Sequence, residues 1–365
     1  MLLAVGVMAA TAPTAEAQDS TQPAVEIIAG RGTKLAAYPY AFYSPETELA
    51  FGAGGVLTFY SSKQQADLRP SKVSLSGYYS TRKQYKFSQT TQLYLDRNRW
   101  FVSLPLEFGF YVDKYWGVGN QTPDVENEDY DVRVFSGRLV AEGPTPVPFV
   151  TRDGFMYEFS NRDVTDIKDN PYLADSVPGA DGGVTSGVGY DMVKDSRDHT
   201  FFPRSGGFHR LNFLWFNSIL GSDFNFGTIE GDLRRYFPVA ADHVVALQLY
   251  GKFVLGQPPF YELAALGGGN VMRGYFSGRY RDRYYVATQV EYRGHVWRRF
   301  GAVVFAGVGD VFGNPESDLS FANLKYSYGF GLRLVFNRQE KINLRADFGF
   351  GKDTRGVYFG LEEAF

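Results

Sequence analysis

The fold is decided by the stretch "KINLRADFGFG", residues 341–351. Apolar side chains stand at every second position of this stretch, and polar residues or glycines stand between them. A strand with this alternation has one face suited to an apolar environment and one suited to water. The same period of two recurs at 243–253 and 325–336 and continues, interrupted by turns, from Leu35 onward. The sequence therefore predicts an all-β protein.

Composition separates a membrane barrel from a soluble sandwich. Aromatic residues make up 17% of the 365 residues, yet the mean hydropathy is only −0.24. A helical membrane protein needs apolar runs of about 20 residues, whereas a β-barrel places apolar residues at alternate positions only. The predicted strands run for about ten to thirteen residues, which is enough to cross a bilayer at a tilt. Because lipid does not tolerate open sheet edges, we expect a closed transmembrane antiparallel β-barrel.

Turn signals divide the alternating region into sixteen predicted strands. They are expected at 35–43, 47–60, 72–81, 85–95, 100–112, 130–142, 148–160, 184–195, 207–218, 225–236, 243–255, 284–297, 301–312, 325–336, 341–350 and 356–365. The longest connections each follow an odd-numbered strand. With both termini in the periplasm, such connections lie outside the cell, where barrel loops are usually longer. The connection at 256–283 is then the sixth external loop.

The first residues are predicted to be a targeting segment. Leu2 to Ala10 is a short apolar core, and Ala15 and Ala17 suit a cleavage site, so residues 1–17 resemble a secretory signal peptide. A short buried helix is the alternative. Residues 18–34 are too few for a periplasmic domain, which leaves 35–365 as a single barrel.

Other classes of function have little support in the sequence. The chain has no cysteine, which excludes disulfides and thiolate chemistry, and its net charge of −3 gives no electrostatic case for nucleic acid. The four histidines lack metal-binding spacing, and no nucleophile-elbow motif is present. We therefore expect no enzyme activity, no cofactor and no metal site.

The long predicted loop contains "LGGGNVMRGYFSGRYRDRYY", residues 266–285. Arg273 lies within it, and an arginine buried inside a barrel would need a fixed anionic partner. Asp310 is the only charge in the apolar strand predicted at 301–312, so it is a candidate partner. The alternative is an exposed basic loop that binds lipopolysaccharide phosphates or nothing.

A second cluster lies in "GYDMVKDSRDHTFFPRSGGF", residues 189–208. Acidic residues and an arginine are followed there by a proline and paired glycines, which indicates a strand that ends in a structured connection. The residues concerned are Asp195, Arg197, Asp198, Pro203 and Gly206. The alternative is a plain periplasmic turn with a solvated run of charges.

Together these motifs resemble the barrel of the BamA/TamA superfamily of outer-membrane proteins, also called the bacterial surface antigen family. Arg273, Gly274 and Tyr275 match that family's arginine-glycine-aromatic motif, with Met272 in place of the usual valine. The resemblance implies that the loop folds into the lumen, where Arg273 contacts an aspartate on strand thirteen, here Asp310. The cluster from Asp195 to Gly206 resembles the family's pattern before strand nine. A form without POTRA domains is expected.

The resemblance implies a role in the insertion of outer-membrane proteins or lipids, or in membrane homeostasis. The barrel would open at a weak seam between its first strand, 35–43, and its last, 356–365. The short first strand offers few ladder hydrogen bonds, and Glu363, which interrupts the apolar face of the last strand, is expected near the interface. Seam and C-terminal signal residues are Phe359, Leu361 and Phe365.

Two alternatives of another class remain open at this point. One is a non-catalytic docking or structural barrel that binds a periplasmic or membrane partner or forms a homo-oligomer. The other is a channel, against which a loop in the lumen argues. The expected surroundings are lipopolysaccharide and phospholipid of the bacterial outer membrane, together with a separate periplasmic partner protein and no nucleic acid.

Overall fold

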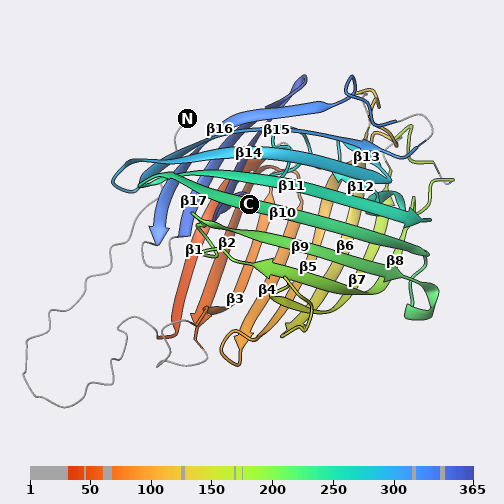
Figure 1. Ribbon diagram of the computed structural model, residues 1–365. Coiled ribbons are helices and arrows are strands. Elements are labelled where there is room, and N and C mark those ends of the chain that lie inside the picture. Colours follow the sequence, from red (N-terminus) through yellow and green to blue (C-terminus); the bar gives the residue numbers. More distant parts are fainter. Residues whose placement is uncertain are drawn as a thin grey trace, which may run out of the picture.

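The computed structural model describes residues 32–44, 47–60, 68–124, 128–167, 170–174, 176–314, 318–337 and 342–365. The segment predicted at 1–17 and residues 18–31 of the segment predicted at 18–34 lie outside this part of the chain. One antiparallel sheet of sixteen strands dominates the molecule and curls round an interior (Figure 1). Its first eight strands are β1 (Lys34–Ser44), β2 (Glu48–Phe59), β3 (Ser71–Ser80), β4 (Tyr85–Leu95), β5 (Trp100–Lys114), β6 (Asp129–Gly143), β7 (Arg152–Asp166) and β8 (Gly182–Asp195).

The second half of the sheet continues in chain order with one interruption. Its strands are β9 (Gly206–Phe216), β10 (Phe226–Ala240), β11 (His243–Gly256), β14 (Tyr284–Trp297), β15 (Phe300–Phe312), β16 (Lys325–Asn337), β17 (Ile342–Gly351) and β18 (Thr354–Leu361). The short strands β12 (Ala264–Leu266) and β13 (Tyr280–Asp282) form a separate hairpin inside the connection from β11 to β14. The predicted sixteen-stranded antiparallel sheet is confirmed.

Only short helical turns accompany the sheet in the described residues. They are η1 (Ser218–Leu220), between β9 and β10, and η2 (Phe260–Glu262), in the long connection after β11. Among the described residues, no helix is long and apolar enough to cross a membrane.

Alternation along the strands places apolar residues outside and polar ones inside. On β14, Val290 and Tyr292 are exposed by 39% and 41%, whereas Glu291 between them is fully buried. The neighbouring strands repeat this pattern, so the sheet presents an apolar belt to its surroundings and buries charge in its interior. This is the inverse of a soluble protein and is the arrangement that lipid requires of a barrel.

The two edges of the sheet, β1 and β18, lie side by side (Figure 1). Every other neighbouring pair of sheet strands is joined by a ladder, and β1 is paired with β2 over its whole length, from Lys34 to Ser44. Among the described residues, no ladder joins β1 to β18. The prediction of a short first strand was wrong: β1 has 11 residues, and β18, with 8, is the shortest strand of the sheet.

The last strand ends earlier than predicted. β18 stops at Leu361, and the C-terminal tail, residues 362–365, leaves the sheet. Phe365 is only 4% exposed, so it does not share the outer face of Phe359, which is 53% exposed. Glu363 lies inside and accepts a hydrogen bond from Arg333 at 2.7 Å, so the prediction that it interrupts the apolar outer face of the last strand was wrong. The side chain of Leu361 is not among those described.

The start of β7 also differs from the prediction, since the strand begins at Arg152 and not at 148. Pro146 and Pro148 precede it, and a proline nitrogen cannot donate to a sheet ladder. Phe149 between them and the strand has a φ of 68°, a left-handed conformation that also interrupts an extended chain.

Candidate functional site

The connection between β11 and β14 enters the barrel and packs against its inner wall. Met272 and Tyr275 of this loop are buried in a cluster with Phe216, Val254 and Tyr285 from β9, β11 and β14. The loop thus contributes to the core, which is otherwise thin in a barrel of this width. We call Arg273, Gly274 and Tyr275 the latch motif, because they make the closest contacts with the wall.

Arg273 has no exposed surface and bridges two buried carboxylates. Its Nη2 lies 2.5 Å from Glu291 Oε2 on β14, and its Nη1 lies 2.6 Å from Asp347 Oδ2 on β17. The guanidinium carbon is 3.5 Å from the centre of the Phe305 ring on β15. The two carboxylates supply the pairing that a buried charge needs, and the contact with the aromatic ring stabilises the cation further.

Further arginines of the wall extend this pair into a network. Arg293 Nε lies 2.8 Å from Glu291, and Arg333 Nη1 lies 2.5 Å from Asp347. Arg333 also holds Glu363 of the C-terminal tail through its Nε, at 2.7 Å. Strands β14, β16 and β17, the loop and the tail therefore share one buried ionic network, in which the removal of a single member leaves others uncompensated.

The backbone of the latch motif is held as firmly as its side chain. Ser327 Oγ donates to the Arg273 carbonyl, Gly274 N–H donates to the Tyr358 hydroxyl at 3.0 Å, and Thr354 Oγ1 donates to the Gly274 carbonyl at 2.9 Å. Gly274 has a φ of +114°, and a Cβ there would stand 2.6 Å from the backbone carbon of Phe350. Only glycine fits both the conformation and the space.

Tyr275 extends the contact toward the turn between β17 and β18. Its hydroxyl donates to the Tyr326 carbonyl at 3.1 Å and accepts from Lys352 N–H at 2.9 Å. Burial raises the pKa of the Tyr275 hydroxyl, which keeps the proton that it donates.

The predicted pairing of Arg273 with Asp310 is wrong. Asp310 is fully buried near the end of β15, where it accepts a hydrogen bond from Asn120 Nδ2 at 2.9 Å and lies 3.7 Å from Lys325 Nζ. Arg273 lies instead against the middle of the wall, where Glu291 and Asp347 supply the negative charge. The carboxylate expected on strand thirteen is thus replaced by carboxylates on the twelfth and fifteenth strands of the sheet, β14 and β17.

The second cluster forms a compact turn between β8 and β9. Asp195 is its centre: it receives Arg197 Nε at 2.9 Å, Arg197 Nη2 at 3.0 Å and Arg69 Nη1 at 2.8 Å. Asp198 Oδ1 accepts from the backbone N–H groups of Arg204 and Ser205. The side chain of Asp195 is only 1% exposed, so a solvated run of charges does not describe this turn.

Gly206 and Pro203 complete the same turn. Gly206 has a φ of +88°, and a Cβ there would stand 2.0 Å from the Ser196 carbonyl oxygen. Pro203 lines the cavity beneath the turn. Each residue of the cluster thus has a structural place in the connection.

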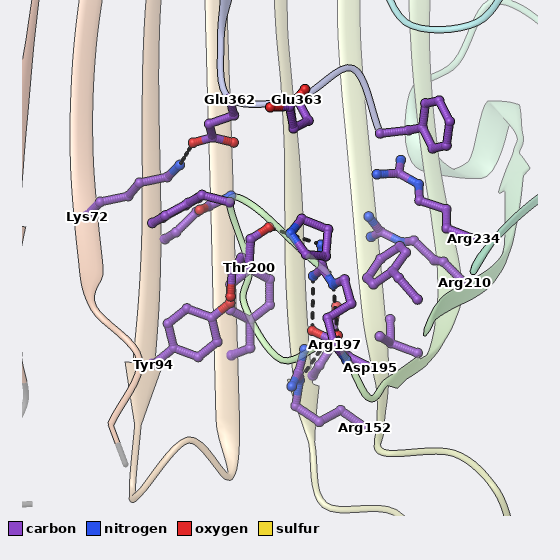
Figure 2. A pocket seen from close by; sticks show the side chains of 18 residues that line it. Lys72, Tyr94, Arg152, Asp195, Arg197, Thr200, Arg210, Arg234, Glu362 and Glu363 are labelled. Atoms are coloured by element: carbon purple, nitrogen blue, oxygen red, sulfur yellow. Dashed lines mark hydrogen bonds and ion pairs between the residues drawn. The ribbon is translucent and has the colours of Figure 1, made fainter. Parts of the chain in front are cut away.

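That cavity, of about 230 Å³, lies between the turn and the C-terminal tail (Figure 2). Several basic side chains point into the cavity, and each forms an ion pair with a carboxylate of the protein. The pairs are Lys72 with Glu362 at 3.4 Å, Arg152 with Glu142 at 2.9 Å, Arg210 with Asp191 at 2.8 Å and Arg234 with Asp232 at 2.5 Å. The cavity therefore offers no free charge to a ligand. No group of three or more potential metal ligands occurs among the described residues.

The residues missed from the sequence are the acidic partners, Glu291 and Asp347, and the arginines beside them. A signal for them was present, because both carboxylates fall on the polar positions of alternating strands and therefore face the lumen. Asp310 was chosen as the partner of Arg273 because it is the one charge in an apolar stretch. The position of each carboxylate in the polar–apolar alternation of its strand was the better criterion.

An apolar outer belt, a charged interior and a loop clamped within it define a transmembrane β-barrel of the outer-membrane type. The sequence profile of the Omp85 superfamily domain matches residues 57–365. The chain belongs to the Omp85 superfamily, which confirms the resemblance to BamA/TamA-type barrels.

Solved structures agree on the fold. The chain is similar to BamA from Haemophilus ducreyi lacking POTRA domains 1–3, with a TM-score of 0.59 and 12% identity over 90% of this chain and 70% of that one. It is also similar to CdiB from Acinetobacter baumannii, with a TM-score of 0.56 and 11% identity over 91% of this chain and 65% of that one. No curated protein sequence matches the chain.

Proposed function

We propose that this outer-membrane barrel promotes the insertion of proteins or lipids into the membrane by opening laterally between β1 and β18. The observation that carries the proposal is the seam itself. β1 and β18 are neighbours, yet among the described residues they share no ladder, while all other adjacent strands do. Separation at the seam costs far fewer hydrogen bonds than separation anywhere else in the sheet.

The latch motif supports this role by stiffening one side of the seam. Gly274 and Tyr275 bond to Tyr358 of β18 and to the turn before it, and Arg273 bonds to Asp347 of β17. These contacts bind the last strands to the loop and not to β1. We infer that β18 remains attached to the ionic network when the seam opens, and that the β1 side moves away.

The orientation follows from loop length. We propose that the N- and C-termini lie in the periplasm and that the connection carrying the latch motif enters from outside, since longer loops are usual on that side. Working partners in this role are membrane lipids and a separate periplasmic protein that delivers the client. Residues 1–17 would act as the export signal, and the role is not enzymatic.

The test uses a variant whose strands β1 and β18 can be joined reversibly by a disulfide bond. The chain has no cysteine, so pairs can be introduced without background. Ala37→Cys or Ala41→Cys on β1 is combined with Val357→Cys or Phe359→Cys on β18, and the pair that crosslinks is reconstituted in liposomes. We expect the reduced barrel to accelerate insertion of an unfolded barrel client and the oxidised one to lose that acceleration.

The matched control locks two strands that are already paired. Leu57→Cys with Val73→Cys crosslinks β2 to β3 at directly opposed positions, so oxidation there should leave the rate unchanged. Equal rates for the oxidised and reduced seam variants, at or below the liposome background, would remove the insertion role. A docking or structural role would then remain, to be examined by purification with its partners.

A further inference from the structure

We propose that the outer face of β8, β9 and β10 binds the phosphate headgroup of an anionic phospholipid. The site consists of Lys194, His209 and Arg235, which lie at the end of the barrel where the turn between β8 and β9 stands. The proposal is independent of the seam, since it concerns the opposite part of the sheet and a resting barrel.

The strand register brings these three residues together on one face. Lys194 on β8 is directly opposite His209 on β9, and Arg235 on β10 is opposite Gly207, two positions before His209. From the spacing of strands and residues, the Cα atoms of Lys194 and Arg235 are about 12 Å apart, a gap that two long side chains can close around a phosphate.

These residues face outward into an apolar surface. Along the same phase of the strands, Leu211, Phe213 and Leu233 are each exposed by 44–45%. His209 shares their phase, because it is opposite Leu233 in the ladder. Basic side chains at the rim of an apolar belt are placed where lipid headgroups meet acyl chains.

Neither Lys194 nor Arg235 is neutralised by the protein. Within the described part of the chain, neither forms an ion pair, in contrast to the cations that line the lumen. Lys194 Nζ lies 5.7 Å from the ring centre of Phe149, and the Arg235 guanidinium lies 5.7 Å from that of Phe237. Both aromatic rings are exposed, Phe149 by 85%. Cations that rest on aromatic rings keep their charge available for an anion.

A carboxylate on the neighbouring strand β7 already has hydrogen-bond partners within the protein. Asp153 at the start of β7 accepts hydrogen bonds from the Tyr190 hydroxyl at 2.5 Å and from Thr145 Oγ1 at 2.6 Å. His209 Nδ1 is buried and has no hydrogen-bond partner among the described residues. The two cations without an ion pair fit a phosphate, and the adjoining apolar surface fits an acyl chain.

The occupant we infer is a phospholipid of the leaflet on this side of the barrel. The exposed apolar side chains beside the cations favour a ligand that carries an acyl chain, because a purely aqueous anion would make no contact with them. Electrostatic attraction of an anionic lipid by two basic side chains adds to that apolar contact.

The experiment measures lipid bound to the purified, folded barrel. Protein in detergent is mixed with phosphatidylglycerol or with phosphatidylcholine, and the bound lipid is quantified by native mass spectrometry. We expect the wild-type barrel to prefer phosphatidylglycerol. Lys194→Ala or Arg235→Ala should weaken that binding about fivefold each, and the double variant about thirtyfold.

The control is an exposed outward arginine elsewhere in the barrel. Arg133→Ala removes a cation on β6 that has Asp163 at 3.7 Å, both side chains being 60% exposed, and should leave binding within about twofold of wild type. Heat-modifiable gel migration verifies that every variant is folded. Equal binding by the double variant and the wild type would overturn the proposal. Displacement of the lipid by an equal concentration of inorganic phosphate would overturn the assignment to a lipid.

Discussion

Two segments of this barrel contain the same combination of residues, an arginine paired with a carboxylate and a glycine with a positive φ, but differ in how far apart the paired residues are in the chain. The latch motif and the turn between β8 and β9 each place an arginine on a buried carboxylate and each contain a glycine whose φ is positive, Gly274 and Gly206. The acidic partners of Arg273 are 18 and 74 residues away in the chain, whereas Asp195, the partner of Arg197, is two residues away.

The difference teaches how each segment depends on the rest of the barrel. The turn has one local ion pair, Arg197 with Asp195, which can form as soon as the turn is made, and one distant pair, because Asp195 also receives Arg69. The latch motif has no acidic partner until β14 and β17 have been brought together by the sheet. We therefore expect the latch motif to depend wholly on the assembled barrel, and the turn to depend on it only in part.

The largest effect is expected from Arg273→Ala, which removes two buried charged hydrogen bonds, to Glu291 and Asp347, and the stacking of the guanidinium on Phe305, while Arg293 and Arg333 stay beside the two carboxylates. The free energy of unfolding should fall by about 3–5 kcal/mol, from the lost charged hydrogen bonds and the lost cation–π contact. Urea unfolding followed by heat-modifiable gel migration measures it. Arg283→Ala in the same loop is the control, because Arg283 is exposed and its side chain donates, within the described residues, to the Gly256 carbonyl alone. A loss for Arg273→Ala no larger than for this control would show that the network contributes nothing to stability.

Gly274→Ala should be the next most harmful change, with a loss of about 2–3 kcal/mol. A Cβ there meets the Phe350 backbone in a conformation that alanine avoids. Gly221→Ala separates the two causes, because Gly221 has a φ of 84° but no atom within 4 Å of a Cβ. It should lose about 1 kcal/mol from conformation alone. Equal losses at both positions would mean that the close approach of loop and wall does not matter.

A smaller loss, about 1–2 kcal/mol, is expected for Arg197→Ala. Asp195 keeps its hydrogen bond from Arg69 in this variant and is therefore not left unpaired. The same unfolding measurement applies, with Arg99→Ala as the control. Arg99 and Asp96 form a local pair too, but their side chains are 63% and 56% exposed, so its removal should have almost no effect. If Arg197→Ala costs as much as Arg273→Ala, the contrast between the two segments fails.

The smallest expected effect is the coupling energy between Arg273 and Asp310, which should be near zero. In a double-mutant cycle, Arg273→Ala and Asp310→Ala should be additive within about 0.5 kcal/mol, because Asp310 is paired with Asn120 and Lys325. The parallel cycle of Arg273→Ala with Asp347→Ala should give a coupling of at least about 1 kcal/mol. A larger coupling for Asp310 than for Asp347 would restore the pairing inferred from the sequence alone.

Strand positions were the most predictable feature of the molecule. The strand predicted at 284–297 coincides with β14, and that predicted at 85–95 coincides with β4. Lipid on one side and a polar lumen on the other impose a period of two on each of these strands, and that period is visible in the sequence. The position of the loop could be predicted from the strand count, and the burial of Arg273 was implied by the resemblance of its motif, since the residues alone also allowed an exposed basic loop.

The partners of that arginine could not be predicted in the same way. Alternation assigns Glu291, Asp347 and Asp310 to strands, but it does not say at what height in the barrel the loop meets the wall. That height depends on how far the loop descends and on the shift of each strand against its neighbour. The end of β18 was mispredicted for a similar reason, because the sequence pattern of Phe365 suits the outer face equally well. Its inward position depends on the hydrogen bond from Arg293 to its carbonyl and on packing against Tyr236.

The sequence by itself determined the all-β class, the number of strands and which faces are apolar, because each of these follows from residues that are close in the chain. Only the tertiary structure decided that Arg273 meets Glu291 and Asp347, that the tail turns inward and that β1 and β18 meet without a ladder. These features depend on contacts between segments far apart in the chain, and such contacts exist only after the sheet has curled into a barrel.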